Sequence, residues 1–262
     1  MGSTFVVGDL HGNLFALKNA IEELNLLNKD NTIIFIGDYA DYGKYNADTL
    51  YYVMKLCKKY DNVKCLIGDH DLMLLNQLEN YLYTPNKEDI YYDKNYLYYS
   101  GGKNTFDTIL KEYSIDKQVE LTEWIKDLPY RIDVKVNGKI YCIVHSDIVE
   151  KLDKNSKNFE HKRRKAILDS TLKNICTNLN INDSLNKLDD ILNEYDVDAI
   201  VFGHVTTNNI SKQRNKMTIQ KMFNNRLICI DCGSEYINSN NSLKYYGQLG
   251  IIKLDDLTEY YF

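Results

Sequence analysis

Three short hydrophobic runs in the first 70 residues of the chain end in the same way. Thr4–Val7, Thr32–Ile36 and Val63–Ile67 are mainly apolar, and each is followed directly by Gly-Asp. Continuous apolar runs of this length are typical of strands that are buried on both faces of a parallel sheet. Ligands of open α/β sheets bind at the carboxyl ends of such strands, so the three acidic loops are predicted to meet at one edge.

The segments between these runs carry apolar residues at helical spacing. Leucine, isoleucine and alanine recur every three or four positions from Leu14, which predicts a helix to about Asn28. Two further helices are expected over Asp48–Tyr60 and Leu72–Tyr83. Strand, acidic loop and helix in series predict an α/β fold with a parallel sheet flanked by helices.

The second half of the chain returns to strands after a different kind of connection. Residues 84–102 are rich in tyrosine, which favours an irregular surface connection over a substrate-facing cap. Helices are expected over 103–127 and most of 157–195. No linker or internal repeat divides the chain, so residues 1–262 are expected to form a single domain. Five strands are expected, at Tyr130–Val136, Lys139–Val144, Ala199–Phe202, Arg226–Ile230 and Lys244–Leu254. A hairpin turn at Asn137-Gly138 joins the first two.

Composition and charge exclude several classes of function. A net charge of -5 and a pI near 5.6 give no basic surface for a sequence-independent grip on nucleic acid. No apolar run approaches the roughly 20 residues that span a bilayer. The chain enters a core strand almost at once, without a signal peptide, so we expect a cytoplasmic protein that does not contact membranes. The six cysteines are expected to be reduced core residues.

Histidines and aspartates gather where the predicted strands end. Such a mixed imidazole and carboxylate set, without thiolate, favours divalent ions such as Mn, Fe or Zn. Two ions about 3.5–4 Å apart, bridged by one carboxylate, would activate a water for in-line attack on a phosphoryl group. Asp38, after the central strand, is the expected bridge. The residues of the set are Asp9, His11, Asp38, Asp69, His70, His145 and His204.

These residues lie in motifs that resemble those of the calcineurin-like metallophosphoesterases. Within this family the chain is most similar to the phosphoprotein phosphatase branch, in particular the small bacterial and bacteriophage-lambda-type protein phosphatases. The resemblance runs from about residue 4 to residue 254 and implies a four-layer αββα sandwich. Its motifs are Gly8-Asp9-Leu10-His11-Gly12-Asn13, Gly37-Asp38-Tyr39-Ala40-Asp41-Tyr42-Gly43, Gly68-Asp69-His70-Asp71, His145 and Gly203-His204.

The resemblance also implies a role for each motif residue. Two divalent metal ions would be bound, with Mn favoured and Fe, Zn, Ni or Mg left open, and a hydroxide bridging them would be the nucleophile. His70, oriented by Asp41, would be the general acid that protonates the leaving oxygen. The implied ligands are Asp9 and His11 for the first metal, Asp38 for both, and Asp69, His145 and His204 for the second.

Three departures from the family pattern concern the metal ligands and the phosphate. Asp69 stands where the family usually has an asparagine ligand, and Tyr42 and Ile67 stand where it usually has arginines that grip the phosphate. A phenol is a poor replacement for a bidentate guanidinium. Arg163 and Arg164 are candidate replacements, with a solvated helix face as the equally weighted alternative.

The sequence thus favours an enzyme that hydrolyses phosphomonoesters on proteins, on serine or threonine with tyrosine left open. The main alternative is a symmetrical dinucleoside-tetraphosphate hydrolase, or another nucleotide phosphatase or phosphodiesterase. Tyr42 and the tyrosines of residues 81–99 would suit such a base-stacking substrate. A non-catalytic scaffold is disfavoured because His70, Asp41 and every ligand position are retained. The oligomeric state is left open.

Overall fold

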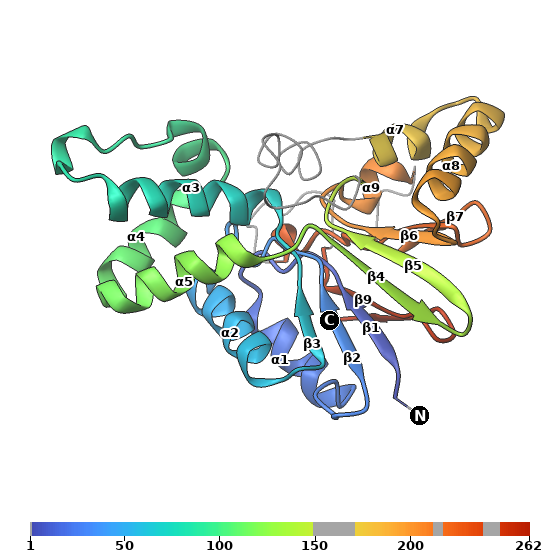
Figure 1. Ribbon diagram of the computed structural model, residues 1–262, viewed down its shortest axis with the longest axis horizontal. Helices are drawn as coiled ribbons and strands as arrows, with labels where there is room; N and C mark the ends of the chain where they lie inside the picture. Colours follow the sequence, from blue (N-terminus) through green and yellow to red (C-terminus); the bar gives the residue numbers. More distant parts are fainter. Residues whose placement is uncertain (1, 149–170, 212–216, 238–246) are drawn as a thin grey trace.

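In the computed structural model of the protein, which describes residues 2–148, 171–211, 217–237 and 247–262, two five-stranded sheets pack face to face (Figure 1). The first sheet has the order β10-β9-β1-β2-β3, and the second has the order β4-β5-β6-β8-β7. The first sheet contains β1 (Thr4–Val7), β2 (Thr32–Phe35), β3 (Val63–Cys65), β9 (Gly250–Lys253) and β10 (Thr258–Tyr261). The second contains β4 (Arg131–Val136), β5 (Lys139–Val144), β6 (Ala199–Phe202), β7 (Gln220–Met222) and β8 (Leu227–Cys229).

Each sheet has three neighbouring parallel strands, which end at the β3 edge in the first sheet and are flanked on both sides by antiparallel strands in the second. Strands β1, β2 and β3 are parallel, and so are β5, β6 and β8. The antiparallel pairings are β1 with β9, β9 with β10, β4 with β5, and β7 with β8. The six parallel strands connect through long crossovers, as parallel strands must.

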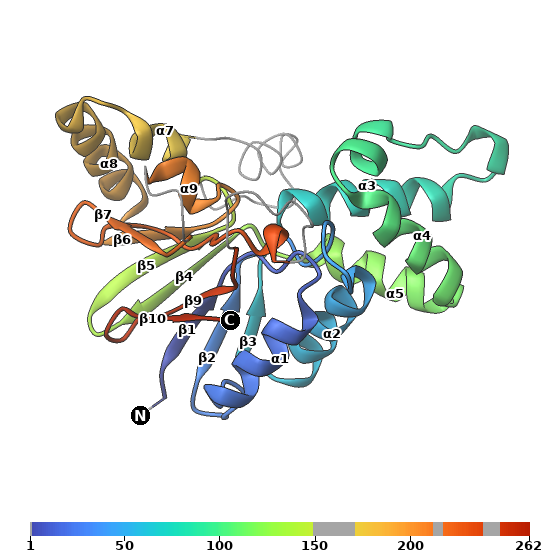
Figure 2. The same cartoon turned by 180° about the vertical axis from the view of Figure 1, so that it is seen from behind.

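Helices cover the outer face of both sheets (Figures 1 and 2). The first sheet packs against α1 (Leu14–Glu23), α2 (Asn46–Lys59), α3 (Asp69–Tyr83), α4 (Gly102–Glu112) and α5 (Ile115–Asp127). The second packs against α7 (Thr171–Thr177) and α8 (Ile181–Tyr195), while α9 (Thr207–Ile210) follows β6. Short helical turns lie at η1 (Lys87–Asp89), η2 (Asn95–Tyr99) and η3 (Ser234–Tyr236).

Three separate apolar cores hold these layers together. One lies between the first sheet and α1 to α5, one between the two sheets, and one between the second sheet and α7 and α8. Neighbouring residues of one strand divide between the cores: Val7 faces the helices, whereas Val6 faces the other sheet. The layers therefore run helix, sheet, sheet, helix, and the predicted αββα sandwich is confirmed.

The structure differs from the sequence prediction at several element ends and in two strands that the sequence did not indicate. The first helix stops at Glu23, not near Asn28, because Asn25 adopts the left-handed conformation (φ 46°). The third helix begins at Asp69, three residues earlier than predicted, which places the acidic loop in its first turn. Strands β7 and β10 were not predicted, and β9 is shorter than the expected strand at 244–254, whose first residues lie outside the described part.

Candidate functional site

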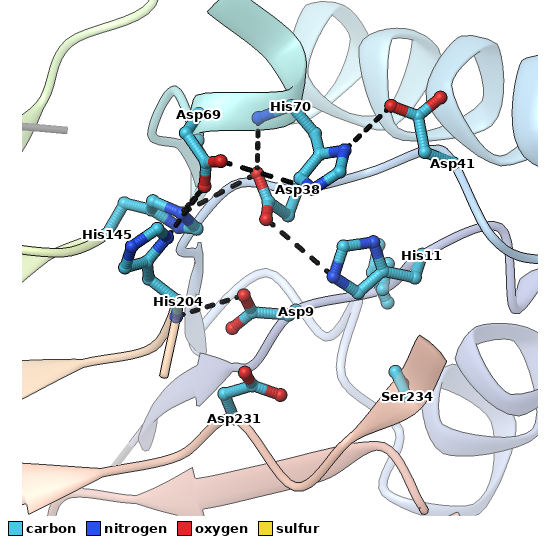
Figure 3. A network of polar contacts seen from close by, with 12 residues as sticks. Asp9, His11, Asp38, Asp41, Asp69, His70, His145, His204, Asp231 and Ser234 are labelled. Atoms are coloured by element: carbon cyan, nitrogen blue, oxygen red, sulfur yellow. Dashed lines mark hydrogen bonds and ion pairs between the residues drawn. The ribbon is translucent and has the colours of Figure 1, made fainter. Parts of the chain in front are cut away.

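The six parallel strands all end at the same edge of the sandwich, and an acid or a histidine follows each of them. Two sheets that pack face to face bring these carboxyl ends together. Figure 3 shows the resulting cluster, in which Asp231 lies beside Asp9. The side chains are Asp9 after β1, Asp38 after β2, Asp69 after β3, His145 after β5, His204 after β6 and Asp231 after β8.

The glycines of the Gly-Asp and Gly-His motifs are needed for close approach of the loops. A Cβ on Gly203 would lie 2.1 Å from Oδ1 of Asp9, and a Cβ on Gly68 would lie 2.1 Å from Oδ1 of Asp38. Asp38 itself adopts a left-handed conformation (φ 53°), which aspartate tolerates better than most residues. The motifs thus encode the tight meeting of three loops as well as the functional side chains.

Asp71 fixes the loop that carries Asp38. Its Oδ2 accepts hydrogen bonds from the backbone N–H groups of Asp38 and Gly68, both at 2.8 Å, and its Oδ1 accepts one from Tyr39 at 3.1 Å. Burial raises the pKa of this carboxyl to about 7 although the three backbone hydrogen bonds act in the opposite direction. Asp71 is therefore a positioning residue, a role that its motif alone did not indicate.

Two buried histidines are oriented so that one ring nitrogen faces the carboxylates. Nδ1 of His11 lies 3.0 Å from the Ala40 carbonyl, and Nδ1 of His145 lies 3.0 Å from the Ile36 carbonyl. Each Nδ1 donates its proton there, and each Nε2 points towards Asp38, at 3.7 and 3.6 Å. Burial lowers the pKa of His11 to about 3 and also lowers that of His145. Neutral imidazoles held in this way are typical metal ligands.

Three buried carboxylates crowd the same small volume. Burial raises the pKa of both Asp9 and Asp38 well above the usual range, and repulsion from Asp231 for Asp9 and from Asp69 for Asp38 adds to this effect. Burial would also raise the pKa of Asp69, but the contacts of its Oδ1 with Nε2 of His145 (3.0 Å) and Nδ1 of His204 (2.7 Å) outweigh burial and lower that pKa. Oδ1 of Asp9 is buried and has no hydrogen-bond partner among the described residues. Such a carboxylate cluster needs added positive charge.

The donor set fits divalent cations. Oxygen and imidazole nitrogen atoms within 4.8 Å of one another form three groups. Asp38 belongs to two of them, as does Asp69, so two neighbouring ions with shared carboxylates suit the geometry. The groups are Asp9, His11 and Asp38; Asp38, Asp69 and His70; and Asp69, His145 and His204.

His70 and Asp41 form a second feature of the site. Nδ1 of His70 donates to Oδ2 of Asp41 at 2.8 Å, and its Nε2 faces inward, 4.0 Å from Oδ2 of Asp69. Burial lowers the pKa of His70, but the hydrogen bond to Asp41 and the charge of Asp69 outweigh it, so the net shift is upward. Two hydroxyls that the sequence did not indicate, from the fully buried Tyr96 and Thr105, donate to Oδ1 of Asp41.

The structure describes one of the three predicted substrate-binding residues. Tyr42 lies at the rim, 43% exposed, with its ring centroid 5.5 Å from that of His11 and 5.2 Å from that of His70. Arg163 and Arg164 lie outside the described residues. Asp231 was not singled out in the sequence; the signal that could have identified it was its place directly after the predicted strand Arg226–Ile230.

The comparisons with known proteins agree with this fold. The family model of the calcineurin-like phosphoesterases matches residues 3–207, and the chain belongs to this family, whose members bind divalent metals. Serine/threonine-protein phosphatase 2 of Salmonella typhimurium is 30% identical over 145 residues, 55% of this chain and 57% of that protein. A symmetrical bis(5'-nucleosyl)-tetraphosphatase of Marinomonas sp. is 24% identical over 136 residues, 52% of this chain and 42% of that protein.

Both matches therefore span only about half the length of these curated relatives. Among solved structures, a mutant of a cold-active protein tyrosine phosphatase aligns with all of this chain and 80% of its own, with 16% identity and a TM-score of 0.57. This likeness supports the fold alone. Within the described part of the chain, no helix has the length and apolar character needed to cross a bilayer.

Proposed function

We propose that the protein hydrolyses phosphomonoesters with two divalent cations, Mn²⁺ in the first place, and that its substrates are phosphorylated proteins. The observation that carries this proposal is the crowding of three buried carboxylates and three histidine nitrogens around two neighbouring positions. In the absence of cations this arrangement buries negative charge at a high cost. Because both sheets contribute ligands, we further propose that residues 1–262 act as one domain.

The ligands divide between the two positions through Asp38. Asp9 and His11 would hold one cation, and Asp69, His145 and His204 would hold the other, with Asp38 between them. Bound divalent cations supply a water of lowered pKa and positive charge for the phosphoryl oxygens. The protein's part is to fix the ligands, since the buried Nδ1 hydrogen bonds of His11 and His145 leave each ring a single orientation.

The leaving oxygen needs a proton when the ester bond breaks, and His70 would give it. Its side chain is 11% exposed, its Nε2 faces the ligand cluster, and Asp41 holds Nδ1 from behind. The upward pKa shift keeps the ring charged nearer to neutral pH, which suits a general acid. His70 would thus be the acid, and Asp41 the residue that positions it.

A second candidate substrate is a dinucleoside polyphosphate. The exposed ring of Tyr42 stands at the rim beside His70, where a base could stack. The two arginines in the described part of the chain, Arg131 and Arg226, bind Asp133 and Asp189. A relative named as a dinucleoside tetraphosphatase favours this alternative, whereas the relative named as a serine/threonine phosphatase favours the first.

One substrate panel separates these alternatives. Metal-stripped protein is refilled with Mn²⁺, and initial rates are measured on a phosphoserine/phosphothreonine peptide, a phosphotyrosine peptide, diadenosine tetraphosphate and bis-p-nitrophenyl phosphate. Faster turnover of the peptides supports the protein phosphatase. Faster turnover of the dinucleotide or the diester supports the alternative. If the protein binds two cations but hydrolyses none of the four substrates, the proposal is wrong and a non-catalytic scaffold becomes the favoured function.

A further inference from the structure

A pocket outside the phosphoesterase site contains a pair of cysteines. Its volume is about 390 Å³, and it lies where α2 and β3 meet the end of α5 and the start of β4. Apolar side chains such as Val63, Leu128 and Ile132 line most of the pocket. Cys57 from α2 and Cys65 from β3 lie in the same wall. Nothing in the proposed phosphoester chemistry uses either thiol.

The two thiols differ in environment although both line the same pocket wall. Cys57 is half-buried, whereas Cys65 is only 3% exposed. The neighbouring Cys65 thiol lowers the pKa of Cys57 to about 6, while burial raises the pKa of Cys65 well above the usual range. One thiol is thus an accessible nucleophile, and its neighbour keeps its proton.

The indole of Trp124 is a second reason to expect a thiolate at Cys57. Its ring is 92% buried, and its Nε1 finds no hydrogen-bond partner of standard geometry among the described residues. The indole lines the same pocket as Cys57 and lowers the pKa of that thiol. A buried donor without an oxygen acceptor is costly unless it serves an anion. The thiolate of Cys57 is such an anion.

We propose that Cys57 and Cys65 form a redox site in which Cys57 reacts with hydroperoxides and Cys65 resolves the product to an intrachain disulfide. In the first step the Cys57 thiolate attacks the peroxide O–O bond and becomes a sulfenic acid, and the alkoxide or hydroxide that leaves takes a proton from water. In the second step the Cys65 sulfur attacks the sulfenic sulfur, and its proton leaves with the hydroxyl as water. Two thiols are oxidised, and one hydroperoxide is reduced to an alcohol and water.

The test needs no phosphatase activity. Full-length protein is treated with a stoichiometric amount of hydrogen peroxide, blocked with iodoacetamide, digested without reductant and mapped by mass spectrometry. We expect a peptide pair linked through Cys57 and Cys65 in the wild type. Cys65→Ser should instead hold a dimedone-reactive sulfenic acid at Cys57. Cys176→Ser is the matched control, because Cys176 is also partly buried but burial raises its pKa to about 12.

The rate of alkylation at Cys57 as a function of pH tests the role of the indole. The midpoint should lie near pH 6 and rise in Trp124→Phe, where a rise of one unit lowers the thiolate fraction at pH 6 roughly fivefold. A wild-type midpoint near that of an ordinary thiol, or peroxide treatment that leaves Cys57 and Cys65 unlinked, would overturn the proposal. Both wild-type measurements remain decisive if a variant does not fold.

Discussion

The interaction between Asp41 and His70 gives the sharpest test of the proposed chemistry. Asp41→Asn keeps the size of the side chain and its place in the loop but removes the charge that faces Nδ1 of His70 at 2.8 Å. Both residues are largely buried, so solvent does not replace the lost interaction. A hydrogen bond to a charged group contributes about 1.5–3 kcal/mol. At 1.36 kcal/mol for each factor of ten, kcat should fall roughly 10- to 150-fold.

The assay is a series of aryl phosphates whose leaving groups differ in pKa. Phenyl phosphate, with a poor leaving group, should show the full loss, whereas 2,4-dinitrophenyl phosphate should be hydrolysed at nearly the wild-type rate, because its leaving oxygen needs no proton. His70→Asn should show the same selectivity with a larger loss, roughly 10²–10⁴-fold. The double variant should be no slower than His70→Asn alone, since Asp41 acts through His70.

A weaker perturbation of the same unit provides a graded control. Thr105→Val removes one hydroxyl that donates to Asp41, and a loss of roughly 2- to 12-fold on phenyl phosphate is expected. Thr122→Val is the matched control, because Thr122 is equally buried in a neighbouring helix but donates to the Gln118 carbonyl. Equal losses on all leaving groups, or additive losses in the double variant, would refute the assignment of His70 as the acid.

Three further predictions concern the cations and the rim. Asp38→Asn should abolish Mn²⁺-dependent turnover and reduce the amount of bound metal measured by mass spectrometry, and asparagine tolerates the left-handed backbone at this position equally well. An unchanged metal stoichiometry would contradict the proposal that Asp38 is shared by both cations. Tyr42→Arg should lower the KM for phosphomonoesters with Tyr42→Phe as control, and an unchanged KM would mean that Tyr42 does not face the phosphate. Metal removal should lower the Tm more at pH 8 than at pH 5. Because the pKa values of Asp9 and Asp38 are raised in the fold, the metal-free protein is more stable at low pH and loses this stability as the pH rises. A difference in Tm between metal-bound and metal-free protein that becomes smaller from pH 5 to pH 8, measured by calorimetry, would contradict this.

Much of the site could be predicted because strand ends and candidate metal ligands coincide in the sequence. Gly-Asp after an apolar run marks a carboxyl end, and parallel strands bring such ends to one edge, so Asp9, Asp38 and Asp69 were predictable as neighbours. His145 and His204 follow the same rule in the other sheet. The motifs also set the backbone, since Gly203 and Gly68 leave room for the facing carboxylates.

The residues that were missed act across long distances in the sequence. Tyr96 and Thr105 reach Asp41 from 55 and 64 residues away, and no local pattern marks a hydroxyl for such a contact. Tyr96 lies in a tyrosine-rich segment that was expected to be irregular, yet it is fully buried while Tyr99 is 81% exposed. Burial within that segment is decided by tertiary packing, which the sequence does not display.

The charge of the site explains why these supports are needed. The strand ends of the two packed sheets lie close together and bury each carboxylate. Repulsion among Asp9, Asp38 and Asp69 therefore opposes folding unless cations are bound. Hydrogen bonds from the backbone to Asp71 hold the Asp38 loop in place against this repulsion. The same argument predicts an order of events: the scaffold around Asp71 and Tyr39 should form without metal, whereas the ligands settle only when cations arrive. Asp71→Asn should therefore weaken cation binding although it touches no cation, because the loop loses the charged acceptor that fixes it.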